Sequence, residues 1–390
     1  MRVIKYFCIL LLLLFSIHSG KAAPKLSNNA QAMLFTCGPG QELYAGFGHS
    51  ALWINDPAKN IDRLYNFGTF DFNTPHFYTR FVRGKLDYML SVTNVRRFLS
   101  EYQHRGIEVY GQKLNLNHTE IETLFALLEE NARPENKYYK YDFFMDNCAT
   151  RIRDVVAASV EGEIDFNTPD ANASYRDLLF PYLTHTPWTR MGINLILGLA
   201  ADKKAPPYNY MYLPEHMKAQ FGKARILTPE GERKLVSSER KYLDNKLTFS
   251  YNALLDPTVI FTLFVLIVIL ISYFEIKRNT HFRLVDIILN SISIFAGLFF
   301  LFMWLGTDHS ATNYNLNSLW LMPAQIVFLL TLFSKKINTQ KWITIALSYQ
   351  IFICIVVNFW PQESEFTFIL LNVLFIIRLL FHFKRVRLSR

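Results

Sequence analysis

The chain has 390 residues, of which 51% are hydrophobic, 15% aromatic and only 19% charged. Soluble domains carry about 25% charged residues, so this composition excludes a wholly soluble protein and a disordered one. The four cysteines are too few for a disulfide-dense scaffold.

The net charge of +9 is concentrated in the C-terminal third of the chain. Residues 257–390 hold 11 Lys and Arg against 5 Asp and Glu, mostly in three basic clusters between apolar segments. Membrane topology accounts for such a distribution better than phosphate binding does. We therefore expect no nucleic-acid partner.

Residues 1–23 have the features of a secretory signal peptide. A positively charged start is followed by an apolar run at 9–17 and by the small residues Gly20 and Ala22. The run is too short to span a bilayer comfortably. Whether or not the segment is removed, we expect residues 24–256 to leave the cytoplasm.

Five apolar segments of spanning length follow, at residues 257–275, 285–305, 318–334, 342–360 and 365–383. Basic clusters come after the first, third and fifth segments, whereas the connections at 307–317 and 361–365 contain no Lys or Arg. By the positive-inside rule the clusters face the cytoplasm. Residues 257–390 are therefore predicted to form an all-α domain of five transmembrane helices in a bacterial inner membrane, with a cytoplasmic C-terminus.

The exported part is predicted to be a single α+β domain over residues 24–256. Alternating apolar residues and turn formers predict a hairpin of strands 49–55 and 61–67. Helical spacing predicts helices at 119–131 and 148–160, and an aromatic run predicts a buried strand at 138–144. After Asp165 the chain is expected to be mostly helical, interrupted by prolines.

Cys148 is the leading candidate for a nucleophile. It begins a predicted helix after Asn147, and a helix N-terminus stabilises a thiolate. His49, next to Gly46 and Gly48, is the candidate base. A hairpin centred on residues 57 and 58 would place Asn66 opposite His49, where its side chain can fix the imidazole tautomer; Asp71 is the other candidate for this orienting role.

On the residues alone the dyad is only one interpretation, because a single Cys and a single His 99 positions apart are weak support for it. In an oxidising compartment Cys37 and Cys148 can instead form a structural disulfide. We find no convincing set of metal ligands and expect no cofactor.

Several motifs extend over most of the chain and carry a family resemblance. In the exported part they are TCGPG at 36–40, FGHSA at 47–51, NFGTFDF at 66–72 and YDFFMDNCATR at 141–151. In the membrane part they include TDH at 307–309 and NYNL at 313–316. In order and spacing the chain resembles the Lnb-type lipoprotein N-acyltransferases.

The resemblance implies a permuted papain-like (NlpC/P60-related) thiol fold, in which the histidine precedes the cysteine. It implies Cys148 as nucleophile, His49 as base, and Asn66 or Asp71 as the orienting group. The implied reaction moves an acyl chain from a phospholipid through a cysteine thioester to the α-amino group of an apolipoprotein's lipidated N-terminal cysteine.

Four further residues are weaker candidates for substrate binding. Arg151 can neutralise an acyl-donor phosphate or Asp146, or form a surface ion pair. His309, Asn313 and Asn315 crowd the connection at 307–317, where polar groups near a bilayer often serve function, although a purely structural polar cap is equally compatible. Arg80, Arg83 and Lys85, interleaved with Phe81 and Tyr88, can face lipid headgroups or simply form a solvated basic edge.

Two other functions remain open. A membrane-anchored NlpC/P60-like cell-wall peptidase or amidase would use the same dyad, although five spans suit an enzyme that draws its substrate from the bilayer. A non-catalytic membrane sensor or assembly protein would instead be held together by a Cys37–Cys148 disulfide.

Overall fold

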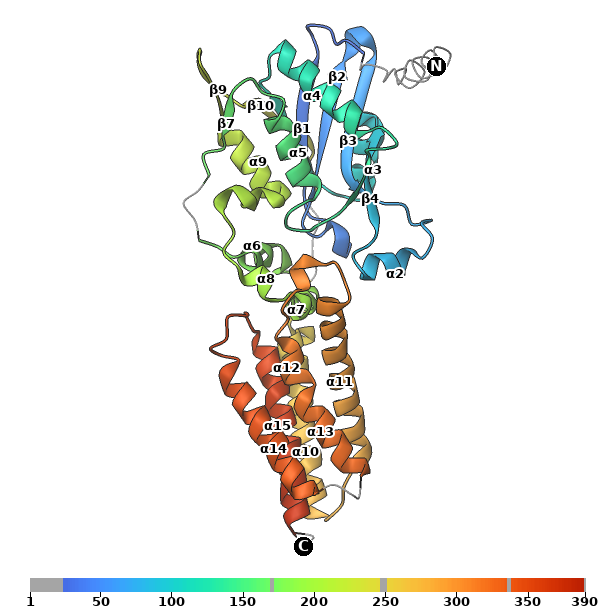
Figure 1. Ribbon diagram of the computed structural model, residues 1–390, viewed down its shortest axis with the longest axis vertical. Coiled ribbons are helices and arrows are strands. Elements are labelled where there is room, and N and C mark those ends of the chain that lie inside the picture. Colours follow the sequence, from blue (N-terminus) through green and yellow to red (C-terminus); the bar gives the residue numbers. More distant parts are fainter. Residues whose placement is uncertain (1–23, 169–171, 246–250, 335–337, 389–390) are drawn as a thin grey trace, which may run out of the picture.

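The computed structural model describes residues 24–168, 172–245, 251–334 and 338–388 (Figure 1). It consists of an α+β domain stacked end to end on a bundle of long helices. The predicted signal peptide at 1–23 and the basic residues Lys335 and Lys336 lie outside the described residues.

The α+β domain is organised around a seven-stranded sheet with the order β10-β5-β1-β2-β3-β4-β6, in which all pairs are antiparallel. Its strands are β1 (Gln31–Cys37), β2 (His49–Asp56), β3 (Ile61–Thr69), β4 (Asp87–Thr93), β5 (Val109–Leu114), β6 (Tyr138–Lys140) and β10 (Val236–Leu243). A small second sheet contains β7 (Glu163–Asp165), β8 (Arg225–Thr228) and β9 (Gly231–Lys234).

The predicted hairpin is present as β2 and β3, but its register differs from the expected one. Leu52 pairs with Tyr65, whereas a turn centred on residues 57 and 58 would pair it with residue 63. The loop consists of residues 57–60 and closes at Asn60 in the left-handed conformation (φ 54°), so its centre lies one residue later. Since side chains alternate with period two, a shift of two leaves every residue on its expected face.

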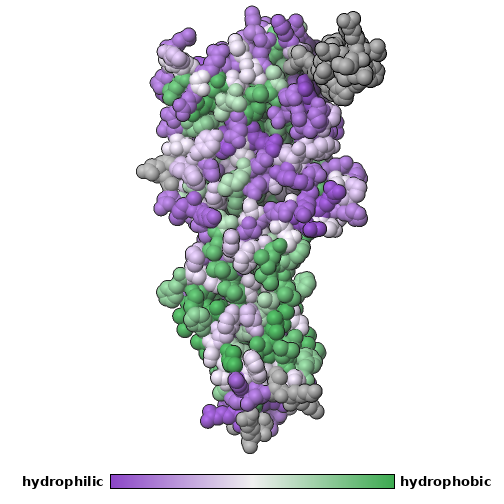
Figure 2. All heavy atoms as spheres, in the orientation of Figure 1, coloured by the Kyte–Doolittle hydropathy of each residue, from purple (hydrophilic) through white to green (hydrophobic). Residues whose placement is uncertain are grey.

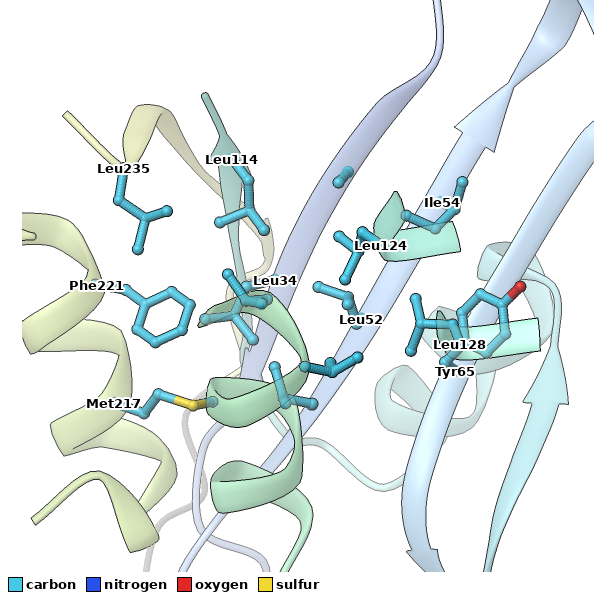
Figure 3. Packing of buried hydrophobic residues seen from close by; sticks show 14 of the residues in the cluster. Leu34, Leu52, Ile54, Tyr65, Leu114, Leu124, Leu128, Met217, Phe221 and Leu235 are labelled. Carbon is cyan, nitrogen blue, oxygen red and sulfur yellow. The ribbon is translucent and has the colours of Figure 1, made fainter. Parts of the chain in front are cut away.

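The two faces of the sheet bury different clusters. On one face Leu34 and Leu52 pack with residues of α4 (His118–Asn131), α5 (Cys148–Ala157) and α9 (Pro214–Lys223) (Figure 3). On the other, Phe35 and Ala51 pack with Phe98 of α3 (Val95–His104). Both helices expected from helical spacing therefore form and bury their apolar sides.

The prediction of a buried strand at 138–144 is mostly wrong. Only Tyr138–Lys140 pairs, at the edge of the sheet. The chain then turns at Asp142, whose carboxylate accepts hydrogen bonds from the backbone N–H groups of Phe144 and Met145. This side chain competes with strand pairing for the local backbone donors, and the turn leads directly into α5.

Between Asp165 and Ala224 the chain is mainly helical, as expected, and prolines start several of its helices. The expectation is wrong for residues 225–243, which form β8, β9 and β10, and β10 pairs with β5 in the main sheet. The α-helices here are α6 (Tyr175–Leu179), α7 (Pro187–Ile196), α8 (Leu199–Asp202) and α9, with short 3-10 turns η3 (Phe180–Leu183) and η4 (Pro207–Tyr212). α7 lies between the two parts of the molecule (Figure 1). Its Trp188 donates a hydrogen bond to the Leu255 carbonyl, and its Arg190 pairs with Glu365.

Among the residues that the structure describes, four helices are long and apolar enough to cross a membrane: α10 (Pro257–Lys277), α11 (Arg283–Leu305), α14 (Thr339–Val356) and α15 (Phe366–Leu388). Their outer surfaces form the hydrophobic half of the molecule in Figure 2. The third expected span is broken into α12 (Asn317–Leu321) and α13 (Pro323–Phe333). Pro323 has no N–H and disfavours helical dihedrals at the preceding residue, and Met322 accordingly leaves the helix (φ −121°).

A buried charged cluster joins three of these helices near the end of the bundle farthest from the α+β domain. Arg378 of α15 donates to both carboxylate oxygens of Asp286 in α11, at 2.6 and 2.9 Å, and also to Glu275 of α10. All three side chains are at most 1% exposed. His281 adds a 2.7 Å hydrogen bond to Asp286.

Candidate active site

Cys148 is the first residue of α5, and its position is set by the side chain of Asn147. The Asn147 oxygen accepts from the N–H groups of Ala149 and Thr150, and the Thr150 hydroxyl accepts from the Asn147 N–H. This is a reciprocal capping box. The Asn147 amide also donates to the carbonyls of Phe143 and Tyr212, so the start of the helix is tied to two other segments.

His49 is brought to the same place as the first residue of β2. The preceding loop passes so close to β1 that a Cβ on Gly48 would lie 2.7 Å from the Cys37 carbonyl oxygen, and Gly48 has φ +79°. Both constraints favour glycine. The imidazole is half-buried and hydrogen-bonded to the Cys148 thiol.

The two side chains favour charge separation. Burial raises the pKa of Cys148, but the His49 charge, its hydrogen bond and the N–H groups of Ser50 and Ala149 lower it by more, leaving it below its ordinary value. Burial lowers the pKa of His49, but the charge and hydrogen bond of Cys148 and the Asn66 hydrogen bond raise it above its ordinary value. The arrangement therefore favours a thiolate beside an imidazolium.

Asn66 of β3 is the group that holds the imidazole. The His49 Nε2 lies 2.5 Å from the Asn66 Oδ1. Because that oxygen can only accept, Nε2 donates and Nδ1 is the nitrogen left to face the thiol. Asp71 is exposed in a turn, where its Oδ1 accepts from the backbone and side chain of Asn73. The structure thus brings Asn66 to His49 and leaves Asp71 in the turn.

Arg151 lies one turn along α5 and neutralises a nearby carboxylate. It forms a two-point ion pair with Asp146 at 2.6 and 2.7 Å and stacks 3.6 Å from the centre of the Tyr139 ring. Asp146 would otherwise oppose ionisation of Cys148. Both donor nitrogens in this pair are engaged within the protein.

Tyrosines around the thiol are site features that the sequence did not single out. A Cβ on Gly68 would lie 3.5 Å from the Tyr141 ring, 3.6 Å from the Cys148 Cβ and 3.8 Å from the Tyr139 hydroxyl. Tyr141 stacks on Tyr88 at 4.5 Å, and burial raises the pKa of Tyr88 to about 12. Two sequence signals point to them: the aromatic run at 138–144, and the motif at 141–151, which begins with Tyr141.

The connection at 307–317 docks on the α+β domain. Its His309 Nε2 donates to the Phe81 carbonyl at 2.9 Å, and Ser310 donates to Asp142 in the turn before Cys148. The buried Asn315 donates to the Leu195 and Ile196 carbonyls.

The backbone carbonyl of Asn313, in the same connection, closely approaches Gly198. His309 and Asn315 therefore bind protein groups in this structure, and their predicted role in substrate binding stays a prediction. The connection as a whole braces the turn that positions the nucleophile.

Cys37 and Cys148 are both free thiols. Cys37 packs in the cluster of Phe35, Phe98 and Tyr102, and burial raises its pKa. Cys148 belongs to the other cluster, with Leu34 and Leu52. The interpretation of Cys37 and Cys148 as a structural disulfide is therefore wrong.

A cavity of about 230 Å³ lies beside the loop that leads to His49. It is lined by residues 40–43, Gly46 and Phe47 on one side and by Tyr182, Leu183, Thr186 and Thr189 on the other. His49, Asn66 and Cys148 are not among its lining residues. Within the described part of the chain, no group of three or more His, Cys, Asp or Glu side chains is placed to hold a metal ion.

Two family models match the chain. The model of the Lnb N-terminal periplasmic domain covers residues 25–181, which include His49, Asn66 and Cys148. The model of the Lnb transmembrane domain covers residues 249–387. No curated protein and no solved structure matches.

Proposed function

Because this chain belongs to the Lnb family of membrane proteins with a periplasmic domain, we propose that it is a thiol-dependent lipoprotein N-acyltransferase of the bacterial inner membrane. The observation that carries the proposal is the Cys148–His49–Asn66 arrangement: a helix-start thiol of lowered pKa, hydrogen-bonded to an imidazole whose other nitrogen is held by an amide. Such a triad suits acyl transfer through a thioester.

In the first half-reaction the Cys148 sulfur attacks the acyl ester carbonyl of a phospholipid. A C–S bond forms, the ester C–O bond breaks, and the His49 imidazolium gives its proton to the departing alkoxide, so that a lysophospholipid leaves as the alcohol. The products of this step are the Cys148 thioester and a neutral imidazole.

In the second half-reaction the α-amino group of the apolipoprotein's lipidated N-terminal cysteine attacks the thioester. His49 takes the amine proton, an amide C–N bond forms, and the C–S bond breaks to release the thiolate. The resting pair of thiolate and imidazolium is then restored.

Each half-reaction passes through an oxyanion that needs nearby donors. The N–H groups of Ser50 and Ala149 already point at the Cys148 sulfur. The Ala149 N–H is shared with Asn147, which leaves the Ser50 N–H as the less committed donor. The Tyr139 hydroxyl is buried without a hydrogen-bond partner in the described structure and is a further candidate.

The contact between the two parts of the molecule supports a lipid substrate. The turn that precedes Cys148 is bonded, through Asp142 and Ser310, to the connection between α11 and α12. The bilayer surface lies at the ends of these helices. A cell-wall peptidase has no need for this link between its nucleophile and a multi-helix membrane domain.

The proposal is tested with the full chain in phospholipid vesicles and a synthetic peptide whose N-terminal cysteine carries a diacylglyceryl group. Mass spectrometry is expected to show the peptide gaining one acyl chain, and Cys148 carrying a hydroxylamine-labile acyl group when the peptide is left out.

Cys148→Ala is expected to abolish both products, whereas Cys37→Ala, which removes the other buried thiol of the α+β domain, is expected to keep them. Full peptide acylation by Cys148→Ala would refute the proposal. Cleavage of cell-wall peptides without acyl transfer would favour the peptidase.

A further inference from the structure

We infer that the segment around α2 (Phe77–Val82) forms a lipid-binding surface that lies in the outer-leaflet interface beside Cys148. This α2 surface consists of four apolar and three basic side chains: Phe72, Tyr78, Phe81, Val82, Arg80, Arg83 and Lys85. The inference deepens the proposed function, on which it rests for lipid as the acyl source, but its test needs no catalysis.

The apolar members of the α2 surface are unusually exposed. Phe72 is 65% exposed, Tyr78 78%, Phe81 44% and Val82 39%. They lie within eleven consecutive residues, and large exposed apolar clusters mark binding sites on otherwise polar surfaces. Aromatic side chains in particular concentrate at membrane–water interfaces.

Hydrogen bonds fix the α2 surface at the level of the membrane boundary. The spanning helix α11 ends at Leu305. Three residues later the Asp308 N–H donates to the Arg83 carbonyl at 3.0 Å, and His309 donates to the Phe81 carbonyl.

The backbones of the two segments also approach each other closely at Gly84, where an added Cβ would lie 3.1 Å from backbone atoms of Asp308 and His309. Figure 1 shows α2 at the height of this connection, beside the top of α11. The α2 surface therefore cannot sit far above the bilayer.

The basic members suit phospholipid headgroups. Arg80, Arg83 and Lys85 are all exposed. Arg80 has a weak ion pair with Asp87 at 3.7 Å, and within the described part of the chain Arg83 and Lys85 have none. Long basic side chains reach from an apolar surface to phosphates, and each contributes about 1 kcal/mol of attraction at an anionic membrane. Aromatic and basic residues together are the composition of an interfacial lipid site rather than of a soluble peptide groove.

A row of aromatic rings connects the α2 surface with the thiol. Phe77, the buried member of α2, packs on Phe70 at 5.7 Å; Phe70 packs on Tyr88 at 5.4 Å; and Tyr88 stacks on Tyr141, which lies beside Cys148 across Gly68. The row makes continuous apolar contact from the α2 surface to the neighbourhood of the nucleophile.

The experiment places a fluorescent probe on the full chain in phospholipid vesicles. Cys148 and Cys354 are replaced by Ala to remove the reactive and the partly exposed thiols, and an environment-sensitive NBD label is attached at Tyr78→Cys. The matched control carries the label at Ala58→Cys, in the exposed hairpin turn at the opposite end of β2 from His49. The protein without an added cysteine gives the blank.

The label at position 78 is expected to show a blue-shifted emission, strong quenching by lipids with a nitroxide near the glycerol backbone, and little quenching by iodide in water. The label at position 58 is expected to show the reverse. Equal iodide quenching at the two positions would overturn the inference and would leave the α2 surface free for a soluble partner.

The kinetics of acyl transfer provide a second test, using a triple variant that combines Arg80→Gln, Arg83→Gln and Lys85→Gln. On anionic vesicles KM for the donor is expected to rise by roughly a hundredfold with kcat unchanged, since about 1 kcal/mol is lost for each of the three basic residues. A buried label at position 78, together with no acyl transfer by the protein that retains Cys148, would refute the proposed function alone. Acyl transfer with a water-exposed label at position 78 would refute the lipid-binding surface alone.

Discussion

At Cys148 two opposing effects decide whether the sulfur is charged. The apolar core of the α+β domain raises the pKa of the thiol, and the charge and hydrogen bond of His49, helped by the Ser50 and Ala149 N–H groups, lower it by more. The reactivity of Cys148 therefore depends on the imidazole more than on the helix end. Without His49, only the effect of burial would remain large.

The pH dependence of thiol alkylation tests this balance. Wild-type Cys148 is expected to react with iodoacetamide at pH values below the ordinary cysteine pKa, because its own pKa is lowered. In His49→Ala the imidazole no longer opposes burial and only the weaker Ser50 and Ala149 N–H groups do, so the pKa of Cys148 rises above its ordinary value. The rate at pH 7 then falls by about tenfold or more, one decade for each pKa unit.

Acyl transfer by His49→Ala is expected to fall by about a hundredfold or more, the usual loss for a general base, and Asn66→Ala to lose less. The wild-type rate is expected to fall at low pH as the thiolate is protonated and at high pH as the imidazolium is deprotonated. An unchanged alkylation profile in His49→Ala would contradict the pairing.

At the scale of the element, α5 matters because its cap also holds two neighbouring segments. Asn147 caps the helix and gives its amide hydrogens to the carbonyls of Phe143 and Tyr212. α4 begins with the same kind of capping box at Asn117, whose amide makes only one long contact, to Glu161 at 3.4 Å. The two helices thus form a matched pair.

Asn147→Ala is expected to lower the free energy of unfolding by roughly 2–4 kcal/mol, since a cap is lost and two buried carbonyls lose their donors. Asn117→Ala is expected to lower it by about 1 kcal/mol. Denaturation in detergent micelles measures both, and the Cys148 alkylation rate is expected to change only in Asn147→Ala. Equal losses in the two variants would show that Asn147 acts as an ordinary cap.

Elements with local signals could be predicted from the sequence. α4 and α5 have capping residues and helical apolar spacing, and the hairpin has turn formers, so all three formed close to the expected positions. Asn66 was placed near His49 despite a register error of two, because that error preserves the face of a strand.

Other features depend on contacts that no local pattern reveals. The break at Pro323 had a local cause, but the expected span ran through it because the apolar run is continuous. The tyrosines around Cys148 and the bond from Ser310 to Asp142 join residues far apart in the chain. The segment at 138–144 was misassigned because aromatic residues suit both a strand and a packed turn, and Asp142 decides between them.

At the scale of the molecule, the bundle is tied together by the ionic cluster of Arg378, Glu275 and Asp286. Removing one partner of a buried ion pair leaves an uncompensated charge and costs about 3–5 kcal/mol. Exposed pairs contribute about 1 kcal/mol at most. Arg190 and Glu365 form such a partly exposed pair between the two parts of the molecule and give a control.

Arg378→Gln is expected to lower the yield of folded protein sharply, whereas Arg190→Gln leaves it close to wild type. Adding Glu275→Gln and Asp286→Asn to Arg378→Gln removes the unpaired charges and is expected to restore much of the yield. Size-exclusion chromatography in detergent measures the folded fraction. Normal yield from Arg378→Gln alone would show that the cluster does not hold the bundle together.

The cluster also has a consequence for how the protein is made. Glu275 and Asp286 are synthesised 103 and 92 residues before Arg378, in the first two long apolar helices, whereas Arg378 belongs to the last helix. Until synthesis is nearly complete, the Glu275 and Asp286 carboxylates lack their Arg378 partner. Arg378 in turn can enter the bilayer at low cost only against those carboxylates. The final helix therefore closes the bundle, because only its insertion brings Arg378 to Glu275 and Asp286.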